Sequence, residues 1–113
     1  MRTPSLTVTE KQFQATVIAM AKTCGWMVYH THDSRKSEPG FPDLTMTRNG
    51  RMVYAELKTQ SGRTTPEQDA WLAALAECDG NEVFVWRPSD FQEITETLAL
   101  ARPATRLEVL TNG

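Results

Sequence analysis

Residues 40–59, GFPDLTMTRNGRMVYAELKT, decide the fold that the sequence predicts. The dipeptide Asn49-Gly50 stands between two runs, 43–48 and 51–58, that are rich in residues typical of strands. Asn-Gly favours a two-residue type I′ turn, because both central residues of that turn need positive φ. We therefore expect this stretch to form an antiparallel β-hairpin.

A two-residue turn also fixes which residues face one another. If Asn49-Gly50 is the turn, Arg48 faces Arg51 and Asp43 faces Glu56. Side chains alternate between the two faces of a strand. One face of the hairpin is then apolar and suits a core; it carries Leu44, Met46, Val53, Ala55 and Leu57. The other face carries Asp43, Thr45, Tyr54, Glu56 and Lys58.

The two carboxylates of the polar face are predicted to meet across the ladder, with Cβ atoms roughly 4.5–5.5 Å apart. Two like charges at that separation are unfavourable unless a positive group lies between them. Lys58 supplies one such group, and a divalent cation would supply more. Oxygen ligands favour Mg²⁺ or Mn²⁺ over zinc. An ordinary exposed hairpin with a Glu56–Lys58 surface pair remains an alternative, and a bulge near Pro42 would break the register.

Working outward from the hairpin, helical spacing of apolar residues and local turn residues predict the other elements. Helices are expected over 9–24, from Pro66 onward and from Ser89 to about 102. Strands are expected over 26–32 and 81–86, with loops over 33–40 and 60–64. The order is α-β-β-β-α-β-α, which predicts an α/β protein with a mixed sheet of about four strands flanked by helices.

The length and composition bound what the protein can be. A chain of 113 residues, 40% apolar and 23% charged, is typical of one globular domain. We expect a single domain over 1–113 with its core at about 9–100. No apolar run is long enough to cross a membrane, no signal peptide is apparent, and the two cysteines lie in no metal spacing, so a cytoplasmic protein is expected. The net charge of −2 disfavours tight nonspecific DNA binding, although a site with a few local cations is compatible with it.

Several short motifs, in the order in which they occur along the chain, resemble those of a known protein family. Pro42-Asp43 followed by Glu56-Leu57-Lys58 resembles the PD-(D/E)XK nuclease motif. The chain resembles more specifically the virus-type replication-repair nuclease (VRR-NUC) family, in the segments EKQFQATVIAMAKTCGWMVYHT, GFPDL, AELKTQSGRTTPEQDAWLAAL and VFVWRPSD. These segments cover roughly residues 10–98.

That resemblance implies metal-dependent cleavage of nucleic acid on a restriction-endonuclease-like core. Asp43 and Glu56 would be ligands of Mg²⁺ or Mn²⁺, with the backbone carbonyl of Leu57 as a third ligand. Lys58 would position the attacking water and stabilise charge on the phosphate.

The resemblance also implies roles for two residues outside the hairpin. Glu10 matches the acidic residue that supplements the metal site, which it would reach through water, and Gln68 matches a Gln near the active site. Each has a structural alternative, because Thr7-x-x-Glu10 and Thr65-x-x-Gln68 both have the spacing of a helix capping box.

Nucleic-acid contacts are predicted for basic and polar residues, namely Ser34, Arg35, Lys36, Arg48, Arg51 and Arg63. The alternative is that these residues are ordinary solvent-exposed polar side chains that do not contact nucleic acid. His30 and His32 alternate onto one face of a strand end, where contact with a DNA groove is a better explanation than zinc. Trp26, Trp71 and Trp86 each lie in an apolar pattern and are expected in the core.

The sequence thus predicts a metal-dependent DNA nuclease, with structured or branched DNA such as Holliday junctions among its substrates. The alternatives are a non-catalytic DNA-binding or assembly module on the same fold, and an RNA-directed nuclease. Small stand-alone members of the family tend to act as dimers, so the resemblance implies a homodimer. Its setting would be DNA repair in the cytosol of a bacterium or of a phage-infected cell.

Overall fold

The structure, a computed structural model, describes residues 3–32 and 37–100. Its elements follow the expected order: α1 (Glu10–Thr23), β1 (Met27–His30), β2 (Leu44–Arg48), β3 (Arg51–Leu57), α2 (Pro66–Ala76), β4 (Asn81–Trp86), the 3₁₀ turn η2 (Pro88–Asp90) and α3 (Phe91–Ala99). The predicted α-β-β-β-α-β-α order is therefore confirmed. Among the described helices, none is long and apolar enough to cross a membrane.

The hairpin forms with the predicted turn and register. Asn49 and Gly50 have φ of 49° and 83°, so both are positive, as a type I′ turn requires. Arg48 pairs with Arg51, and Leu44 pairs with Ala55. The sheet order is β1-β2-β3-β4, with β4 parallel to β3 and the other neighbours antiparallel. The parallel pair arises because the crossover through α2 returns the chain in the same direction.

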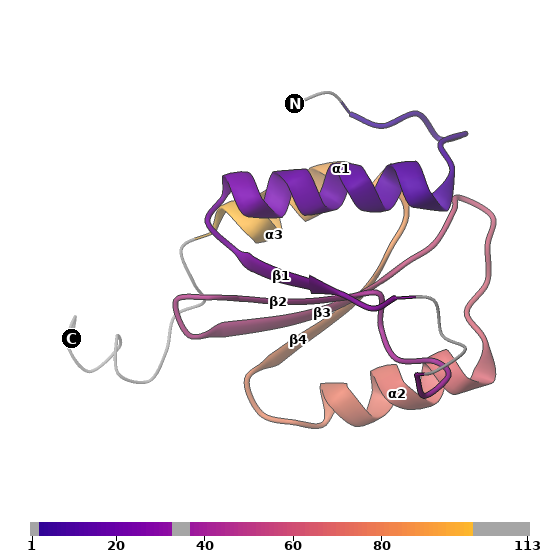
Figure 1. Cartoon of the computed structure of the whole chain (residues 1–113), viewed down its shortest axis with the longest axis vertical. Coiled ribbons are helices and arrows are strands. Elements are labelled where there is room, and N and C mark those ends of the chain that lie inside the picture. Colours follow the sequence, from indigo (N-terminus) through magenta and orange to yellow (C-terminus); the bar gives the residue numbers. More distant parts are fainter. Residues whose placement is uncertain (1–2, 33–36, 101–113) are drawn as a thin grey trace.

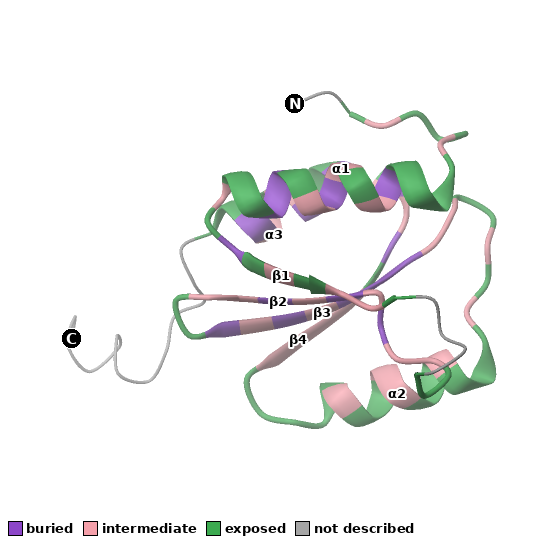
Figure 2. Cartoon of the chain, in the orientation of Figure 1, coloured by how far each residue is buried: buried purple, intermediate pink, exposed green. Residues whose placement is uncertain are grey.

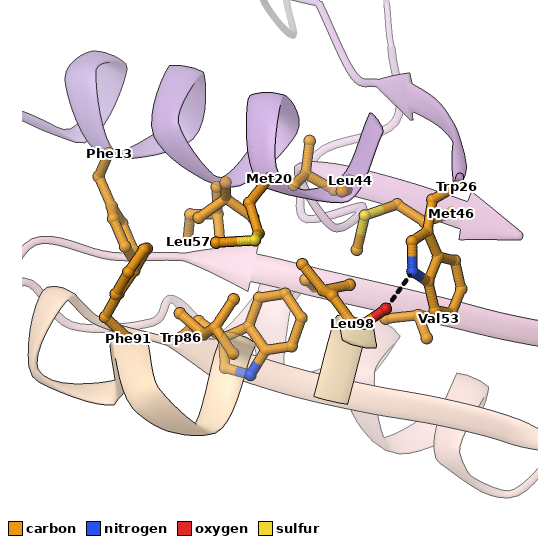
Figure 3. Packing of buried hydrophobic residues seen from close by; sticks show 14 residues of the cluster. Phe13, Met20, Trp26, Leu44, Met46, Val53, Leu57, Trp86, Phe91 and Leu98 are labelled. Carbon is orange, nitrogen blue, oxygen red and sulfur yellow. Dashed lines mark hydrogen bonds between the residues drawn. The ribbon is translucent and has the colours of Figure 1, made fainter. Parts of the chain in front are cut away.

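The helices divide between the two faces of the sheet (Figure 1). Helices α1 and α3 cover one face and α2 lies across the other. The core fills the space between α1, α3 and the sheet (Figure 3). It consists of Phe13, Val17, Met20, Ala21, Trp26, Leu44, Met46, Val53, Ala55, Leu57, Trp86, Phe91, Ile94 and Leu98. All five residues of the predicted apolar hairpin face are in this core, as alternation along the strands requires.

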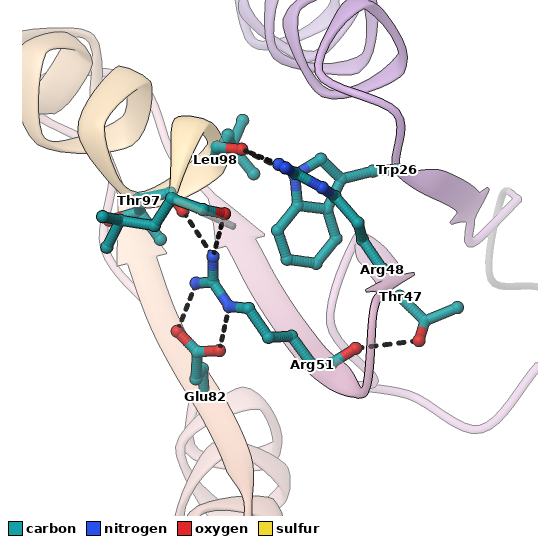
Figure 4. Close-up of polar contacts among 8 residues, drawn as sticks. Trp26, Thr47, Arg48, Arg51, Glu82, Thr97 and Leu98 are labelled. Atoms are coloured by element: carbon teal, nitrogen blue, oxygen red, sulfur yellow. Dashed lines mark hydrogen bonds and ion pairs between the residues drawn. The ribbon is translucent and has the colours of Figure 1, made fainter. Parts of the chain in front are cut away.

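Arg51, at the hairpin tip, has a different role from the predicted one. Its side chain is buried, and its guanidinium donates to both carboxylate oxygens of Glu82, at 2.7 and 2.6 Å. It also donates to the backbone carbonyls of Thr97 and Leu100, at 2.8 and 3.1 Å (Figure 4). The expectation that Arg51 binds phosphate is therefore wrong, because its donors already hold Glu82 and the last turn of α3.

Arg48 lies beside it and also caps α3. Its Nη1 donates to the carbonyl of Leu98 at 2.9 Å, the same carbonyl that accepts from the indole of Trp26. Both arginines lie over the Trp26 ring, with Arg51 the closer at 4.8 Å. Arg48 is about 16 Å along the strand from Asp43, at ~3.3 Å per residue. This end of the hairpin thus anchors the C-terminus of α3, and it is remote from the Asp43–Glu56 pair.

Helix α2 is less deeply packed than the other two. Its large apolar residues, Trp71, Leu72 and Leu75, are only half-buried, as the pink and green ribbon of α2 shows (Figure 2). The prediction of a core position is confirmed for Trp26 and Trp86 and wrong for Trp71. The reason is that α2 covers the face of the sheet opposite the core.

Candidate active site

Asp43 is held in place from both sides at the open end of the hairpin. The backbone N–H of Thr31 donates to the carbonyl of Asp43 at 2.8 Å, and the Thr31 hydroxyl donates to the carbonyl of Pro42 at 2.8 Å. Asp43 Oδ2 accepts from the backbone N–H of Leu57 at 2.8 Å. The side chain of Asp43 thus reaches across to β3 just beyond the end of the β2–β3 ladder.

Glu56 lies next to it and is buried, with only 1% of its surface exposed. Its Oε2 accepts from Gln68 Nε2 at 3.0 Å and lies 3.4 Å from Lys58 Nζ. Its Oε1 is buried and has no hydrogen-bond partner within the described part of the chain. An exposed surface pair of Glu56 and Lys58 is therefore not what the hairpin forms.

The burial of Glu56 changes its acidity. Loss of hydration on burial, and secondly the neighbouring Asp43 carboxylate, raise the pKa of Glu56 to about 8. Lys58 acts in the opposite direction with a smaller effect. In the metal-free protein Glu56 therefore carries a proton at neutral pH. A buried carboxyl group with a strongly raised pKa is typical of functional sites.

Glu10 is the first residue of α1 and lies close enough to Asp43 and Lys58 for their charges to act on it. Although Glu10 is an exposed residue, partial loss of hydration, and secondly the charge of Asp43, raise its pKa above the ordinary value, while Lys58 lowers it. The capping box of α1 is formed by Thr9 and Gln12, whose side chains each bond the other's backbone N–H at 3.1 and 3.0 Å. The alternative of a Thr7–Glu10 capping box is therefore wrong, because the N-cap of α1 is Thr9, two residues after Thr7.

Gln68 combines the two roles that the sequence offered as alternatives. Its Oε1 accepts from the backbone N–H of Thr65 at 2.9 Å, and Thr65 Oγ1 accepts from the backbone N–H of Gln68 at 3.1 Å. The amide nitrogen of the same side chain donates to Glu56. One end of the amide thus caps α2 while the other end holds the buried carboxyl group.

Beside these groups lies a polar cavity of about 310 Å³. Its lining consists of Glu10, Thr31, His32, Glu38, Gly40, Phe41, Asp43 and Gln68. Four lining residues, Thr31, Glu38, Gly40 and Phe41, were not expected at the site, because no periodicity or motif in the sequence assigns them to it. His32 was expected only at a strand end near a groove, and its place in the cavity lining is consistent with that.

Of the remaining predicted contact residues, only Arg63 is described, and it does not line the cavity. Ser34, Arg35 and Lys36 lie outside the described residues. Arg63 is exposed in the loop between β3 and α2.

The donor set suits a hard cation better than zinc. Across residues 3–32 and 37–100, no three His, Cys, Asp or Glu side chains are grouped as a complete metal site. The available side-chain donors are the carboxyl groups of Asp43 and Glu56; the buried Glu56 Oε1 has no partner among the described residues, and Glu56 would release its proton on binding a cation. Mg²⁺ is commonly held by one or two carboxylates and keeps several waters. The residues present therefore fit Mg²⁺ or Mn²⁺.

A scan against protein families matches residues 3–89 to the model of the VRR-NUC domain. The match includes α1, the whole hairpin, α2 and β4. No curated protein and no solved structure matches the chain.

Proposed function

Because the chain belongs to the VRR-NUC family of nucleases, we propose that it is a Mg²⁺- or Mn²⁺-dependent nuclease that hydrolyses phosphodiester bonds of DNA. The observation that carries this proposal is the buried Glu56 carboxyl group. It has one oxygen without a partner among the described residues and lies beside Asp43 and Lys58. A purely structural glutamate at this depth would be expected to have both oxygens bonded.

Asp43, Glu56 and the carbonyl of Leu57 would hold the ion. The N–H of Leu57 points to Asp43. In an extended strand the N–H and C=O of one residue point to the same side, so the Leu57 carbonyl is directed toward Asp43 as well. When bound, the ion supplies polarisation of the phosphoryl oxygen and lowers the pKa of a bound water.

Lys58 contributes a cation at the reacting phosphate. Its side chain is largely buried, with 12% exposed, and its Nζ lies 3.4 Å from Glu56 Oε2, where it would be the counter-charge of an ionised Glu56. A fixed cation in a dry site stabilises negative charge that develops on the phosphate more strongly than it would in water. Lys58 also has three donors to orient the attacking water.

Glu10 and Gln68 act around the two ligands. Glu10, whose pKa responds to the charges of Asp43 and Lys58, would hold a metal-bound water. Gln68 fixes the direction of the Glu56 carboxyl group through its amide nitrogen. A carboxylate oriented in this way loses less freedom when it binds a cation.

The substrate would be DNA, with branched DNA such as Holliday junctions among the structures cut. A homodimer would present two sites related by a two-fold axis and would cut two strands symmetrically. Such an activity would serve DNA repair in the cytosol, in a bacterium or during phage infection.

The test is a panel of labelled linear, flapped, four-way and RNA substrates, incubated with Mg²⁺, with Mn²⁺ and with Ca²⁺. We expect cleavage of DNA with Mg²⁺ or Mn²⁺ and poor cleavage with Ca²⁺, which is larger and activates water less. If the protein cleaves RNA in preference to DNA, RNA would be its substrate. Binding of DNA without cleavage in any metal would favour a non-catalytic module.

A further inference from the structure

The position of α2 matters to the site because α2 carries Gln68. The core does not hold this helix, since its three large apolar residues are only half-buried on the opposite face of the sheet. The amide nitrogen of Gln68 nevertheless lies 3.0 Å from Glu56 Oε2. Something other than the core must therefore set the first turn of α2 against the carboxylates.

Gly40 makes one of the contacts that do so. A Cβ atom at Gly40 would lie 2.5 Å from the carbonyl carbon of Glu67 and 2.8 Å from the backbone nitrogen of Gln68. Both are backbone atoms, which cannot move aside as a side chain can. Gly40 also has φ of +94°, which a side chain rarely allows. The segment before Asp43 is thus packed directly on the Glu67–Gln68 peptide.

Phe41 makes the second contact. Its ring lies edge-on to Trp71 of α2, with centroids 5.1 Å apart, and edge-on to Tyr54 of β3, with centroids 6.1 Å apart. Trp71 is three residues after Gln68, on the same face of the helix. Phe41 therefore bridges the strand that carries Glu56 and the helix that carries Gln68.

We propose that Trp71 is a positioning residue of the active site: its contact with Phe41, beside the close approach of Gly40, sets the amide of Gln68 against Glu56. Trp71 is not among the residues that line the polar cavity, and it acts on the site through Gln68. Its effect on cleavage rests on the proposed nuclease function, whereas its effect on Gln68 does not.

The first test is a double-mutant cycle on cleavage between Trp71→Ala and Gln68→Ala. Each change alone should lower kcat about tenfold, the order expected when a hydrogen bond to an ionisable group is lost. In the Gln68→Ala background, Trp71→Ala should have little further effect, because both changes remove the same contact. Losses that multiply in the double mutant would overturn the proposal.

Two further variants separate positioning from loss of packing. Leu75→Ala truncates another half-buried apolar side chain of α2, one turn further on, and should leave kcat within about twofold of wild type while lowering Tm to a similar degree as Trp71→Ala. Trp71→Phe keeps an aromatic ring for Phe41 and should restore most of the rate. A rate loss in Leu75→Ala as large as in Trp71→Ala would also contradict the proposal.

The second test needs neither metal nor cleavage. The side-chain amide signals of Gln68 are observed by NMR in the metal-free protein and assigned by their absence in Gln68→Ala. In Trp71→Ala these protons should move toward the shifts of a solvated amide and exchange faster with water, and in Leu75→Ala they should not. Unchanged Gln68 signals in Trp71→Ala would refute the inference. The expected NMR result in a protein that cleaves nothing would instead refute only the proposed function.

Discussion

At the scale of single residues, Glu56 determines how the metal-free protein responds to pH. Its pKa is about 8 in the folded protein and has its ordinary value, 4.5, when the chain unfolds. Between these values the folded state holds more protons than the unfolded state, so the free energy of unfolding falls as pH rises. The stabilising contribution is complete below about pH 4.5 and is lost by about pH 8.

Glu56→Gln should remove much of this dependence. Urea unfolding with chelator present, at intervals from pH 5.5 to 8.5, is expected to show wild-type stability falling toward pH 8 and a flatter profile for the variant. The raised pKa of Glu10 acts with the same sign in both proteins, so the difference between the two curves isolates Glu56. Parallel curves would mean that the pKa of Glu56 is not raised on folding.

Lys58 is predicted to matter for rate and little for folding. Lys58→Ala should lower kcat by about 10²–10³, the range found when one group that stabilises transition-state charge is removed. Its 3.4 Å contact with Glu56 lowers the pKa of that group, so Lys58→Ala should raise this pKa further and shift metal binding to higher pH, while the loss of rate should persist at saturating metal. The measurements are single-turnover cleavage at saturating Mn²⁺ and Mn²⁺ titration across a range of pH. Near wild-type turnover would limit Lys58 to an ion pair with Glu56.

At the scale of elements, the hairpin could be predicted because residues close together in the sequence determine both its turn and its register. Asn49-Gly50 determines the turn, and the turn determines that Leu44 pairs with Ala55. The end of α1 that carries Glu10 was harder, since two overlapping Thr-x-x patterns compete for the cap and local sequence does not separate them. The role of Arg51 could not be predicted, because its partners Glu82 and Thr97 are distant in sequence and adjacent only after folding.

The residues of the candidate site also divide into those that the local sequence predicts and those whose contacts depend on the folded arrangement. Asp43, Glu56 and Lys58 follow from the hairpin register and the motif. The dual bonding of Gln68 and the contact of Phe41 with Trp71 depend on where α2 lies over the sheet. No periodicity in the sequence specifies that position, which is why Trp71 was expected in the core.

The arginine at the hairpin tip gives a prediction about stability. Arg51→Ala should lower the free energy of unfolding by about 3 kcal/mol, because it leaves Glu82 without its bidentate partner and uncaps α3. Arg48→Ala, which loses one bond to the Leu98 carbonyl, should cost about 1 kcal/mol and serves as the comparison. Urea unfolding measures both. If the two variants are equally stable, the buried pair does not anchor α3.

At the scale of the whole molecule, the charge limits how the protein can bind DNA. The net charge is −2, and the acidic groups Glu10, Glu38 and Asp43 line the cavity. Affinity should therefore come from few phosphate contacts, and log K should fall with log salt with a slope of about −2 to −4 per copy. Fluorescence anisotropy with a labelled duplex in Ca²⁺ measures the slope. A value near about −10, as for an extensive basic surface, would contradict this.

The central claim, that the Asp43–Glu56 pair holds a metal ion that makes the whole domain a nuclease, is tested most directly by one cleavage assay. Wild type and Glu56→Gln are incubated with labelled four-way and linear DNA, in Mn²⁺ at pH 8 and in excess chelator. The variant keeps the size of the side chain and an oxygen for Gln68, so its fold should persist. The prediction is cleavage by wild type in Mn²⁺ alone, and none by the variant in either condition. Cleavage by wild type in chelator, or by the folded variant in Mn²⁺, would contradict the claim.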